Sequence, residues 1–493
     1  MTPCTRTTRA ALAAIIAGLA LGVHPAASQQ PDKTPPSTQM VLKGRAPVSR
    51  DILKVTLPKP DQVVLPNGLR IMVLENHRAP EVSFQLVIPG AGGYYDPADR
   101  AGLASFVAAM MREGTATRSS AQISEALETM GASLFVTSSA SSTSAQIFGS
   151  ALTQSFPKLF EVASDMVLHP AFAAAEWDRF RTRTKAGFVQ SRTNPGFLAN
   201  ERFNQAVFGA HPAGRVQSTA AVLDAVTPQA LADFHRAHYV PDYAVIAFAG
   251  DITPAQARAL VDQYVGGWQR AGVPEPKVDD PAPISGPKIY LISRPGSVQT
   301  TLFVGTQALA RTSQDYLALS VANRVLGGVM GRLFRHLREE KGYTYGIGSG
   351  ISSSPYVGSW ATSTSVRTEV TEPALHDLLA EIAGLRDTPV PEQELEDSKR
   401  ALVASFALSL ESPQQVLSYY LDSWTYNLPA TYWDTYPARI AAITAAQAQA
   451  AARKYWDSSR LQIVAVGDAS KLRDILAKIG PVEVYDADGK PIP

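Results

Sequence analysis

The chain has 493 residues and a formal net charge of +1, with 45% hydrophobic and 18% charged residues. This balance is that of an ordinary globular protein and gives no electrostatic case for nucleic acid or acidic lipid as a partner. The length exceeds that at which one hydrophobic core usually stops growing, so we expect at least two domains. The only cysteine is Cys4, which excludes a disulfide framework.

The first residues have the pattern of an export signal. Arg6 and Arg9 precede an apolar run at residues 10–23, and small residues follow at 26–28. Because this run is short for a membrane span, we predict a cleaved signal peptide at residues 1–28, with a retained anchor as the alternative. Cleavage would remove the only thiol. The mature protein is then expected to be exported, to the periplasm in a bacterium, and no later stretch is apolar for long enough to cross a membrane.

Strand and helix signals follow in the next part of the chain. Asn67-Gly68 lies between apolar runs and predicts a hairpin with a type I′ turn. Ser119 and Gln122 suit a capping box at the start of a helix. Other predicted elements are strands near residues 82–88 and 133–146 and helices at about 101–113 and 156–168.

A capped helix followed by an apolar strand ending in Gly-Asp occurs twice. In the first copy Thr227 begins the helix and Gly250 ends the strand, and Thr444 and Gly467 hold the same places in the second. Both pairs are 217 residues apart. A shared period of this length indicates two homologous halves.

The Pro-rich stretch at residues 271–287 predicts a linker between these halves. We therefore expect one domain at residues 50–270 and a second at 288–486. Strands and long helices without strict alternation predict an α+β fold, in which each half is a mainly antiparallel sheet with helices packed on one face.

Residues 102–115, Gly-Leu-Ala-Ser-Phe-Val-Ala-Ala-Met-Met-Arg-Glu-Gly-Thr, resemble the active-site helix of the pitrilysin (insulinase) family of zinc peptidases. Active members have Gly-Leu-Ala-His-Phe-Leu-Glu-His-Met there, with Gly-Thr a few residues on. Residues 92–97 and 326–345 resemble the turn before this helix and the glycine-bearing loop of the second half. The resemblance covers roughly residues 55–485, and matching motifs in both halves make it specific.

The resemblance implies a zinc site that this chain has lost. An inverted His-x-x-Glu-His motif binds zinc through two histidines four apart on a helix, while the glutamate acts on the metal-bound water. Here the histidine positions hold Ser105 and Ala109, and the glutamate position holds Ala108. The family's third ligand falls near Ala186 or Gly187. We therefore expect no metal in this chain and no peptidase activity of the chain alone.

Other chemistry has little support in the sequence. His235 and His238, three residues apart, are the only histidines that could share a helix face, and we expect a surface or packing pair. His211 lies in a segment that resembles a family loop, for which we expect a structural role. The Ser-rich stretch at 138–144 falls in a predicted strand without a histidine near it, and no Gly-x-Ser-x-Gly elbow occurs.

Groups that bind the peptide in the family are kept in the second half. The resemblance implies that Arg338 and Tyr345, seven residues apart, hold the backbone of a bound peptide. The alternative is that Arg338 forms a surface ion pair with Glu339 or Glu340 and that Tyr345 is a plain strand residue. Gly327 and Gly328 belong to a loop that comes close to substrate in the family, although a tight turn before a helix would need the same glycines.

Together these expectations describe one half of a clam-shell peptidase. The resemblance implies a non-catalytic, substrate-binding subunit that pairs with a zinc-bearing homologue, as a heterodimer or a dimer of heterodimers, and acts on peptides. The partner would supply the zinc. A non-enzymatic peptide-binding or scaffold protein on the same fold is the first alternative, and an enzyme with relocated catalytic groups is the second.

Overall fold

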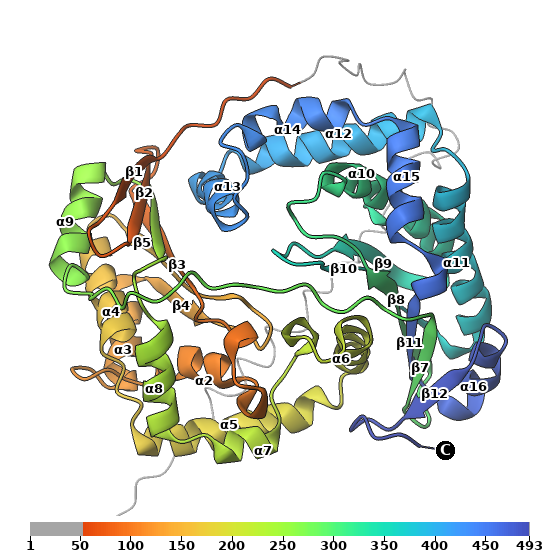
Figure 1. Ribbon diagram of the computed structural model, residues 1–493, viewed down its shortest axis with the longest axis horizontal. Coiled ribbons are helices and arrows are strands. Elements are labelled where there is room, and N and C mark those ends of the chain that lie inside the picture. The colour runs from red at the N-terminus through yellow and green to blue at the C-terminus, as the bar shows by residue number, and fades with distance from the viewer. Residues whose placement is uncertain (1–52, 493) are drawn as a thin grey trace, which may run out of the picture. The chain divides into compact units, whose positions relative to one another are not determined.

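The computed structural model describes residues 53–492, which form two six-stranded sheets (Figure 1). The strand orders are β1-β2-β6-β3-β5-β4 and β12-β7-β11-β8-β10-β9. Five strands follow one another in the same spatial order in both sheets, and the only parallel pair among these five is β2 with β6 in one sheet and β7 with β11 in the other. The predicted α+β fold with two similar halves is confirmed. The predicted signal peptide lies outside the described residues.

In the first half, groups of strands are followed by groups of helices. Its strands and longer helices are β1 (Asp61–Val64), β2 (Arg70–Glu75), β3 (Glu81–Pro89), α2 (Leu103–Met110), α3 (Ser120–Met130), β4 (Ser133–Thr137), β5 (Ser144–Leu152), α4 (Phe156–Leu168), α5 (Ala174–Ser191), α6 (Pro195–Phe208), α7 (Ala220–Ala225), α8 (Pro228–His238), β6 (Val245–Gly250) and α9 (Pro254–Tyr264).

The second half has the corresponding elements and a longer helical layer. They are β7 (Lys288–Ser293), β8 (Gln299–Gln307), α10 (Tyr316–Gly327), the π-helix η5 (Phe334–Glu340), β9 (Thr344–Ile351), β10 (Ser359–Arg367), α11 (Thr371–Asp387), α12 (Glu392–Ser409), α13 (Pro413–Thr425), α14 (Tyr432–Ala441), α15 (Ala445–Tyr455), β11 (Gln462–Gly467), α16 (Ala469–Ala477) and β12 (Val482–Tyr485).

Side-chain caps fix the helix starts that the sequence predicts. The Thr227 and Thr444 hydroxyls accept hydrogen bonds from the third residue of α8 and α15, respectively. Ser119 and Gln122 form both halves of the predicted capping box of α3. Each cap satisfies backbone N–H groups that have no partner inside the helix.

Two local predictions are wrong. The β1–β2 hairpin exists, but its turn is not type I′, because Pro66 precedes Asn67 and, of the Asn-Gly pair, only Gly68 has a positive φ, of 94°. The predicted strand at 133–146 is two strands, and most of the Ser-rich stretch forms the turn between β4 and β5. Hydroxyl side chains suit both strands and turns, so alternation alone does not separate them.

One face of each sheet carries the helices of its own half. The core of the first half joins alternate residues of β2 and β3 to α2, α3, α4 and α8, and that of the second half joins β7 and β8 to α10, α11 and α15. The opposite face of each sheet is covered by one helix from the other half. Leu198 and Phe203 of α6 pack on Val464 of β11, whereas Leu417 and Leu421 of α13 pack on the face of β2, β3 and β6 (Figure 1).

The predicted linker at residues 271–287 has no regular secondary structure and is held by both halves. Asp279 donates its N–H to the Tyr94 hydroxyl at 2.8 Å, and its carbonyl lies 2.9 Å from His211 Nε2. From the second half, Gln307 Nε2 donates to the Ala282 carbonyl at 2.7 Å. In residues 53–492 no helix combines the length and apolarity that crossing a membrane requires.

Candidate functional site

Helix α2 presents the positions of the lost zinc ligands, and its start is firmly fixed. It begins after Gly102, whose φ is 107° and where a Cβ would lie 2.5 Å from the Ser218 Cβ. Only glycine adopts this conformation without strain. The Asp96 carboxylate accepts hydrogen bonds from the backbone N–H of Gly102 at 2.6 Å and of Ala104 at 2.9 Å. The helix therefore keeps its register without a metal ion.

Asp96 is buried beneath this helix start, with 5% exposure. Burial raises the pKa of its carboxyl to about 6, although the hydrogen bonds from Ala104 and Gly102 and the charge of Arg215 act in the opposite direction. Arg215 itself donates to the carbonyls of Gly93 at 3.0 Å and of Asp96 at 3.3 Å.

The former ligand positions carry no metal-binding chemistry. Ser105 and Ala109, one helical turn apart, are half-buried, and Ala108 lies in the core at 1% exposure. Ala186, at the predicted place of the third ligand, is exposed on α5. Methyl groups offer zinc no lone pair, and one serine hydroxyl does not make a site. Within the described part of the chain, no three His, Cys, Asp or Glu side chains gather so that they could hold a metal.

The histidine pair of α8 has structural partners instead. His235 Nε2 lies 2.8 Å from the Val167 carbonyl, and His238 Nδ1 lies 2.8 Å from the Gly90 carbonyl. Burial lowers the pKa of His235 to about 4 and also lowers the pKa of His238. Two neutral rings bonded to different segments support the packing interpretation.

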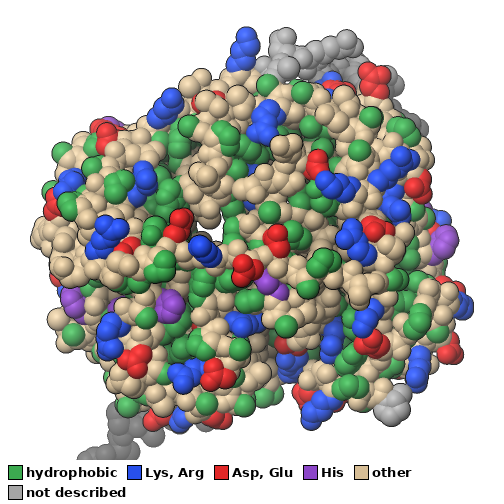
Figure 2. Space-filling view, in the orientation of Figure 1, with side chains coloured by type: hydrophobic (Ala, Val, Ile, Leu, Met, Phe, Trp, Pro, Cys, Tyr) green, Lys and Arg blue, Asp and Glu red, His purple; other side chains and the backbone are tan. Residues whose placement is uncertain are grey.

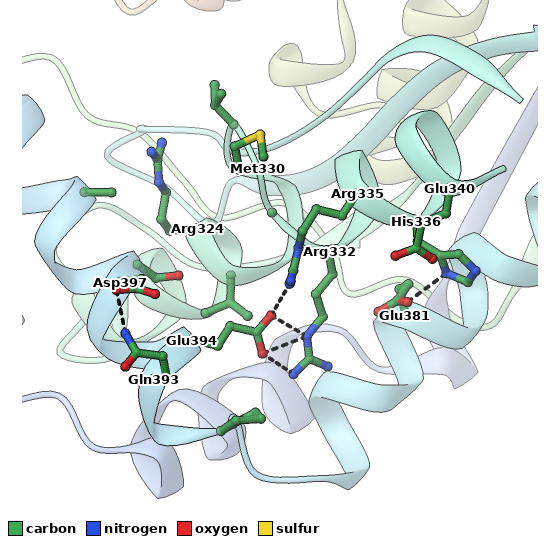
Figure 3. Close-up of a pocket in the computed structure, with 16 residues that line it drawn as sticks. Arg324, Met330, Arg332, Arg335, His336, Glu340, Glu381, Gln393, Glu394 and Asp397 are labelled. Carbon is green, nitrogen blue, oxygen red and sulfur yellow. Dashed lines mark hydrogen bonds and ion pairs between the residues drawn. The ribbon is translucent and has the colours of Figure 1, made fainter. Parts of the chain in front are cut away.

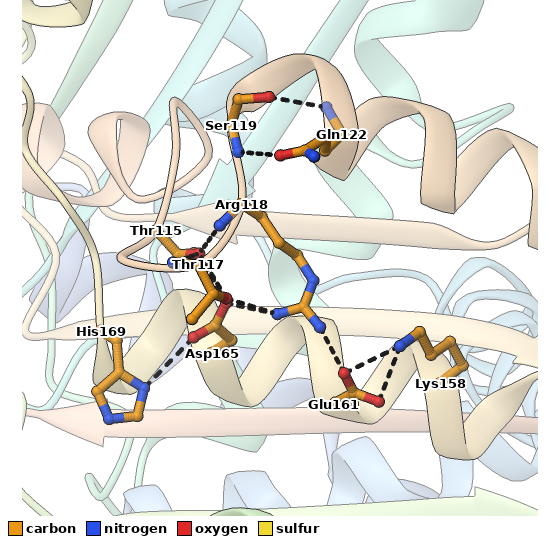
Figure 4. Close-up of polar contacts among 9 residues, drawn as sticks. All are labelled: Thr115, Thr117, Arg118, Ser119, Gln122, Lys158, Glu161, Asp165 and His169. Carbon is orange, nitrogen blue, oxygen red and sulfur yellow. Dashed lines mark hydrogen bonds and ion pairs between the residues drawn. The ribbon is translucent and has the colours of Figure 1, made fainter.

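The segment after α2 is tied to α4 by a network around Asp165 (Figure 4). Its Oδ2 accepts hydrogen bonds from Thr115 at 2.6 Å, Thr117 at 2.7 Å and Arg118 at 2.6 Å. Burial acts to raise the pKa of Asp165, but these donors outweigh it and the pKa lies below its usual value. Asp165 was not predicted from the sequence, where its only signal is an acidic position on a predicted amphipathic helix.

In the second half, η5 carries Arg338 and β9 carries Tyr345. The Arg338 guanidinium carbon lies 5.5 Å from the centroid of the Tyr345 ring and 4.5 Å from that of Phe334. Tyr345 is 92% exposed. Arg338 forms no ion pair with any carboxylate in residues 53–492, so the surface ion pair with Glu339 or Glu340 is not observed. Its N–H donors are open to an added carbonyl or carboxylate.

The helix that presents Arg338 has an unusual backbone. The N–H of Lys341 donates to the carbonyl of His336, five residues earlier, at 3.0 Å. π-Helical turns of this kind are rare and are frequently found at functional sites. No pattern in the sequence predicts this π-helix.

The glycine-bearing loop lies beside β9, and its glycines have packing reasons of their own. A Cβ at Gly327 would lie 2.1 Å from the Ser349 side chain, and one at Gly328 would lie 2.6 Å from the Arg324 carbonyl oxygen. The exposed tip consists instead of Val329 and Met330, at 74% and 56% exposure. Met330 has a φ of 65°, which costs a side-chain-bearing residue about 1–2 kcal/mol. The resemblance drew attention to the glycines, whereas this strained apolar tip was not predicted.

A cavity of about 870 Å³ lies behind the tip, between α10, η5, α11 and α12 (Figure 3). Glu394 in its wall accepts hydrogen bonds from Arg332 and Arg335, and His336 Nδ1 lies 2.9 Å from Glu381. Charges of both signs are also interspersed on the surface of the molecule seen in Figure 2. The mixture does not select an anionic or a cationic ligand.

The fold and site thus define a peptidase scaffold whose metal-binding helix holds no metal ligands. Residues 70–217 match the family model "Insulinase (Peptidase family M16)", and residues 225–402 match "Peptidase M16 inactive domain". An uncharacterized zinc protease of Mycobacterium tuberculosis is 30% identical over 298 residues, which cover 59% of this chain and 67% of that protein. One from Mycobacterium leprae is 26% identical over 363 residues, 72% of this chain and 80% of that protein.

Solved structures agree with this assignment. A peptidase M16 inactive domain from Pseudomonas fluorescens superposes with a TM-score of 0.77 at 26% identity, over 83% of this chain and 98% of that one. A Helicobacter pylori protease gives the same TM-score at 16% identity, over 83% of this chain and all of that one, and supports the fold alone. This chain belongs to the peptidase M16 (insulinase) family. Within that family it is of the inactive type, without the zinc motif.

Proposed function

We propose that this chain is the non-catalytic, substrate-binding subunit of an exported heterodimeric M16 peptidase. A zinc-bearing homologue would cut the peptide, while this chain would supply Arg338, Tyr345 and the glycine-bearing loop. The signal peptide predicted at residues 1–28 supports a location outside the cytoplasm, which in a bacterium would be the periplasm.

The proposal rests on one contrast. The first half has lost every zinc ligand on α2, whereas the second half keeps Arg338 stacked on Tyr345, and no carboxylate of residues 53–492 pairs with Arg338. A chain that no longer took part in peptide binding would have no need for a guanidinium beside an exposed phenol in this arrangement. An unpaired guanidinium matches the carbonyl and carboxylate groups of a peptide.

Reconstitution tests the proposal. The chain is purified with its native binding partners, any zinc-bearing M16 homologue is identified, and hydrolysis of an unstructured peptide is measured for each protein alone and for the pair. We expect activity only in the pair. Arg338→Ala and Tyr345→Phe should each lower kcat/KM at least about tenfold, which corresponds to ~1.4 kcal/mol. Arg179→Ala, a surface arginine on α5 paired with Glu176, is the matched control.

The alternatives give different results in the same assay. A scaffold protein would copurify with its partner, but Arg338→Ala and Tyr345→Phe would leave the activity of the pair unchanged. Hydrolysis by a zinc-free preparation of this chain alone would instead point to relocated catalytic groups and contradict the proposal.

A further inference from the structure

A second cavity, of about 520 Å³, lies where the two halves and the linker meet. The first half contributes parts of β2, β3 and the segment before β6 to its wall. The linker, which runs from the first half to the second in Figure 1, contributes Glu275, Pro276 and Val278. Pro355 and Trp424 come from the second half. Cavities of this size between domains are common places for small-molecule sites.

Flat and stiff side chains make up much of this wall. Pro276 packs closely on Gly90, where an added Cβ would lie 2.9 Å from the proline ring. Trp424 is partly buried against the core that α13 forms with the first sheet. Proline and aromatic rings have few conformations to lose when a ligand binds against them. The wall therefore suits a flat apolar body, and its ring-bearing members are Pro66, Pro89, Tyr95, Tyr243, Pro276, Pro355 and Trp424.

Polar groups in the same wall have no hydrogen-bond partner within residues 53–492. They are the Tyr95 hydroxyl, the Trp424 indole N–H and the hydroxyls of Thr143 and Ser144. All four residues are partly buried, and tyrosine and tryptophan in such places usually bond their polar atom to a partner. Burial raises the pKa of Tyr95 to about 12, so its hydroxyl keeps the proton and can donate it in a hydrogen bond. The cavity thus offers several donors without acceptors.

One cation in the wall also lacks a partner of opposite charge. Arg70 has only a long hydrogen bond, of 3.5 Å, to the Gln62 side chain, and no carboxylate of residues 53–492 forms an ion pair with it. The nearby Asp242 is buried and already accepts from two backbone N–H groups of the linker, and Arg270 lies 3.4 Å from it. Glu275 is exposed, so solvent screens its charge. The one unpaired guanidinium gives the cavity a place for a single negative charge.

We infer that this cavity binds a small monocarboxylate with a flat apolar body, of the size of a bicyclic aromatic acid. The Arg70 guanidinium takes the carboxylate, with Tyr95 as a second donor, and the ring lies against Trp424 and the prolines. Since the wall belongs to both halves and the linker, the bound acid stabilises their arrangement and raises Tm. The site goes beyond the proposed function and does not depend on it.

Calorimetric titration of the isolated chain tests the site. The probes are 2-naphthoate and the neutral 2-naphthylmethanol, which have the same ring system. We expect 2-naphthoate to bind with a Kd below about 1 mM, about tenfold tighter than the alcohol, and to raise Tm. Arg70→Met keeps the apolar stem and should weaken 2-naphthoate about tenfold while leaving the alcohol unchanged. Arg78→Met is the matched control, at an exposed arginine outside the cavity that has no ion pair within residues 53–492.

A second variant separates binding from folding. Tyr95→Phe removes a hydroxyl that has no partner within residues 53–492, so the Tm without ligand should not fall, while 2-naphthoate should bind about threefold more weakly. No binding by the wild type at millimolar concentration, equal affinity for acid and alcohol, or unchanged affinity in Arg70→Met would each overturn the inference. So would 2-naphthylmethylamine binding as tightly as the acid, because Glu275 would then select a cation. These measurements need no catalytic partner, so their outcome is independent of the peptidase proposal.

Discussion

Asn194 and Ser412 cap the two helices that the halves exchange. The Asn194 Oδ1 accepts from the N–H groups of Gly196 and Phe197 at the start of α6, and the Ser412 hydroxyl accepts from that of Gln415 at the start of α13. Each helix then leaves its own half and covers the sheet of the other. Since both caps stand directly before a proline at the first helical position, the exchange is built identically in the two halves.

The exchange predicts that each helix matters to the stability of the whole chain. Leu198→Ala in α6 and Leu417→Ala in α13 remove side chains with 1% and 3% exposure. Each should lower the free energy of unfolding by about 2–4 kcal/mol in urea titrations. Leu408→Ala, at 68% exposure on α12, is the matched control and should change it by less than about 0.5 kcal/mol. Equal effects of all three would contradict the packing described.

Asp96 should make the free energy of unfolding fall as the pH rises. Its pKa is raised from 3.8 to about 6 in the folded protein, so the folded state holds the proton more tightly than the unfolded state. The associated stability is fully present below pH 3.8 and is lost as the pH rises through about 6, up to about 3 kcal/mol. Asp96→Asn keeps a carbonyl acceptor but does not ionise. The wild type should therefore lose stability relative to Asp96→Asn between pH 4 and pH 7 in urea unfolding, and parallel curves would contradict this.

The strained loop tip predicts opposite changes in stability and activity. Met330→Gly relieves a left-handed residue and should raise Tm slightly or leave it unchanged, since glycine's unfolded-state entropy offsets part of the gain. It also removes an exposed apolar side chain, so the reconstituted pair should lose activity. Leu408→Ala removes apolar surface elsewhere and should not affect turnover. A large fall in Tm for Met330→Gly would show that the conformation is not strained.

Substitutions in helix α2 should restore part of a metal site. Ser105→His with Ala109→His places two imidazoles one turn apart on a half-buried face, whose start Asp96 and Gly102 still fix. This variant should bind zinc weakly, measured by metal analysis after dialysis, and should not hydrolyse peptide. Adding Ala108→Glu should lower stability, because position 108 is 1% exposed and would bury a carboxylate. Zinc bound by the wild type at this helix would contradict the loss of the site.

The sequence allowed those parts of the fold that depend on local chemistry to be predicted. Capping side chains such as Ser119 and Thr444 mark helix starts because they bond within three residues, and the Thr227–Thr444 period marks the duplication. The exchange of α6 and α13 was not predicted. An amphipathic pattern shows that one face of a helix is buried, but it does not show against which sheet that face packs. The same limit hid the Val329–Met330 tip, whose exposure is a tertiary property.

The positions of the lost zinc ligands, unlike the hydrogen bonds around them, could be predicted from the sequence. Ser105, Ala108 and Ala109 were placed by the motif around them, which needs no tertiary information. Asp165 bonds Thr115, a residue far from it in the sequence, and Asp96 bonds Gly102 through a bend of the backbone before α2. Acidic residues on a predicted helix or turn give no sign of such bonds.

A half-length chain with this topology would leave one face of its sheet bare and carry a helix with nothing to cover. Two such chains could cover each other's sheets by exchanging these helices, so the present molecule has the contacts that a helix-swapped homodimer would have. The segment at residues 271–287, which is hydrogen-bonded to Tyr94 and Gln307, is the covalent connection that keeps the two halves together in this arrangement.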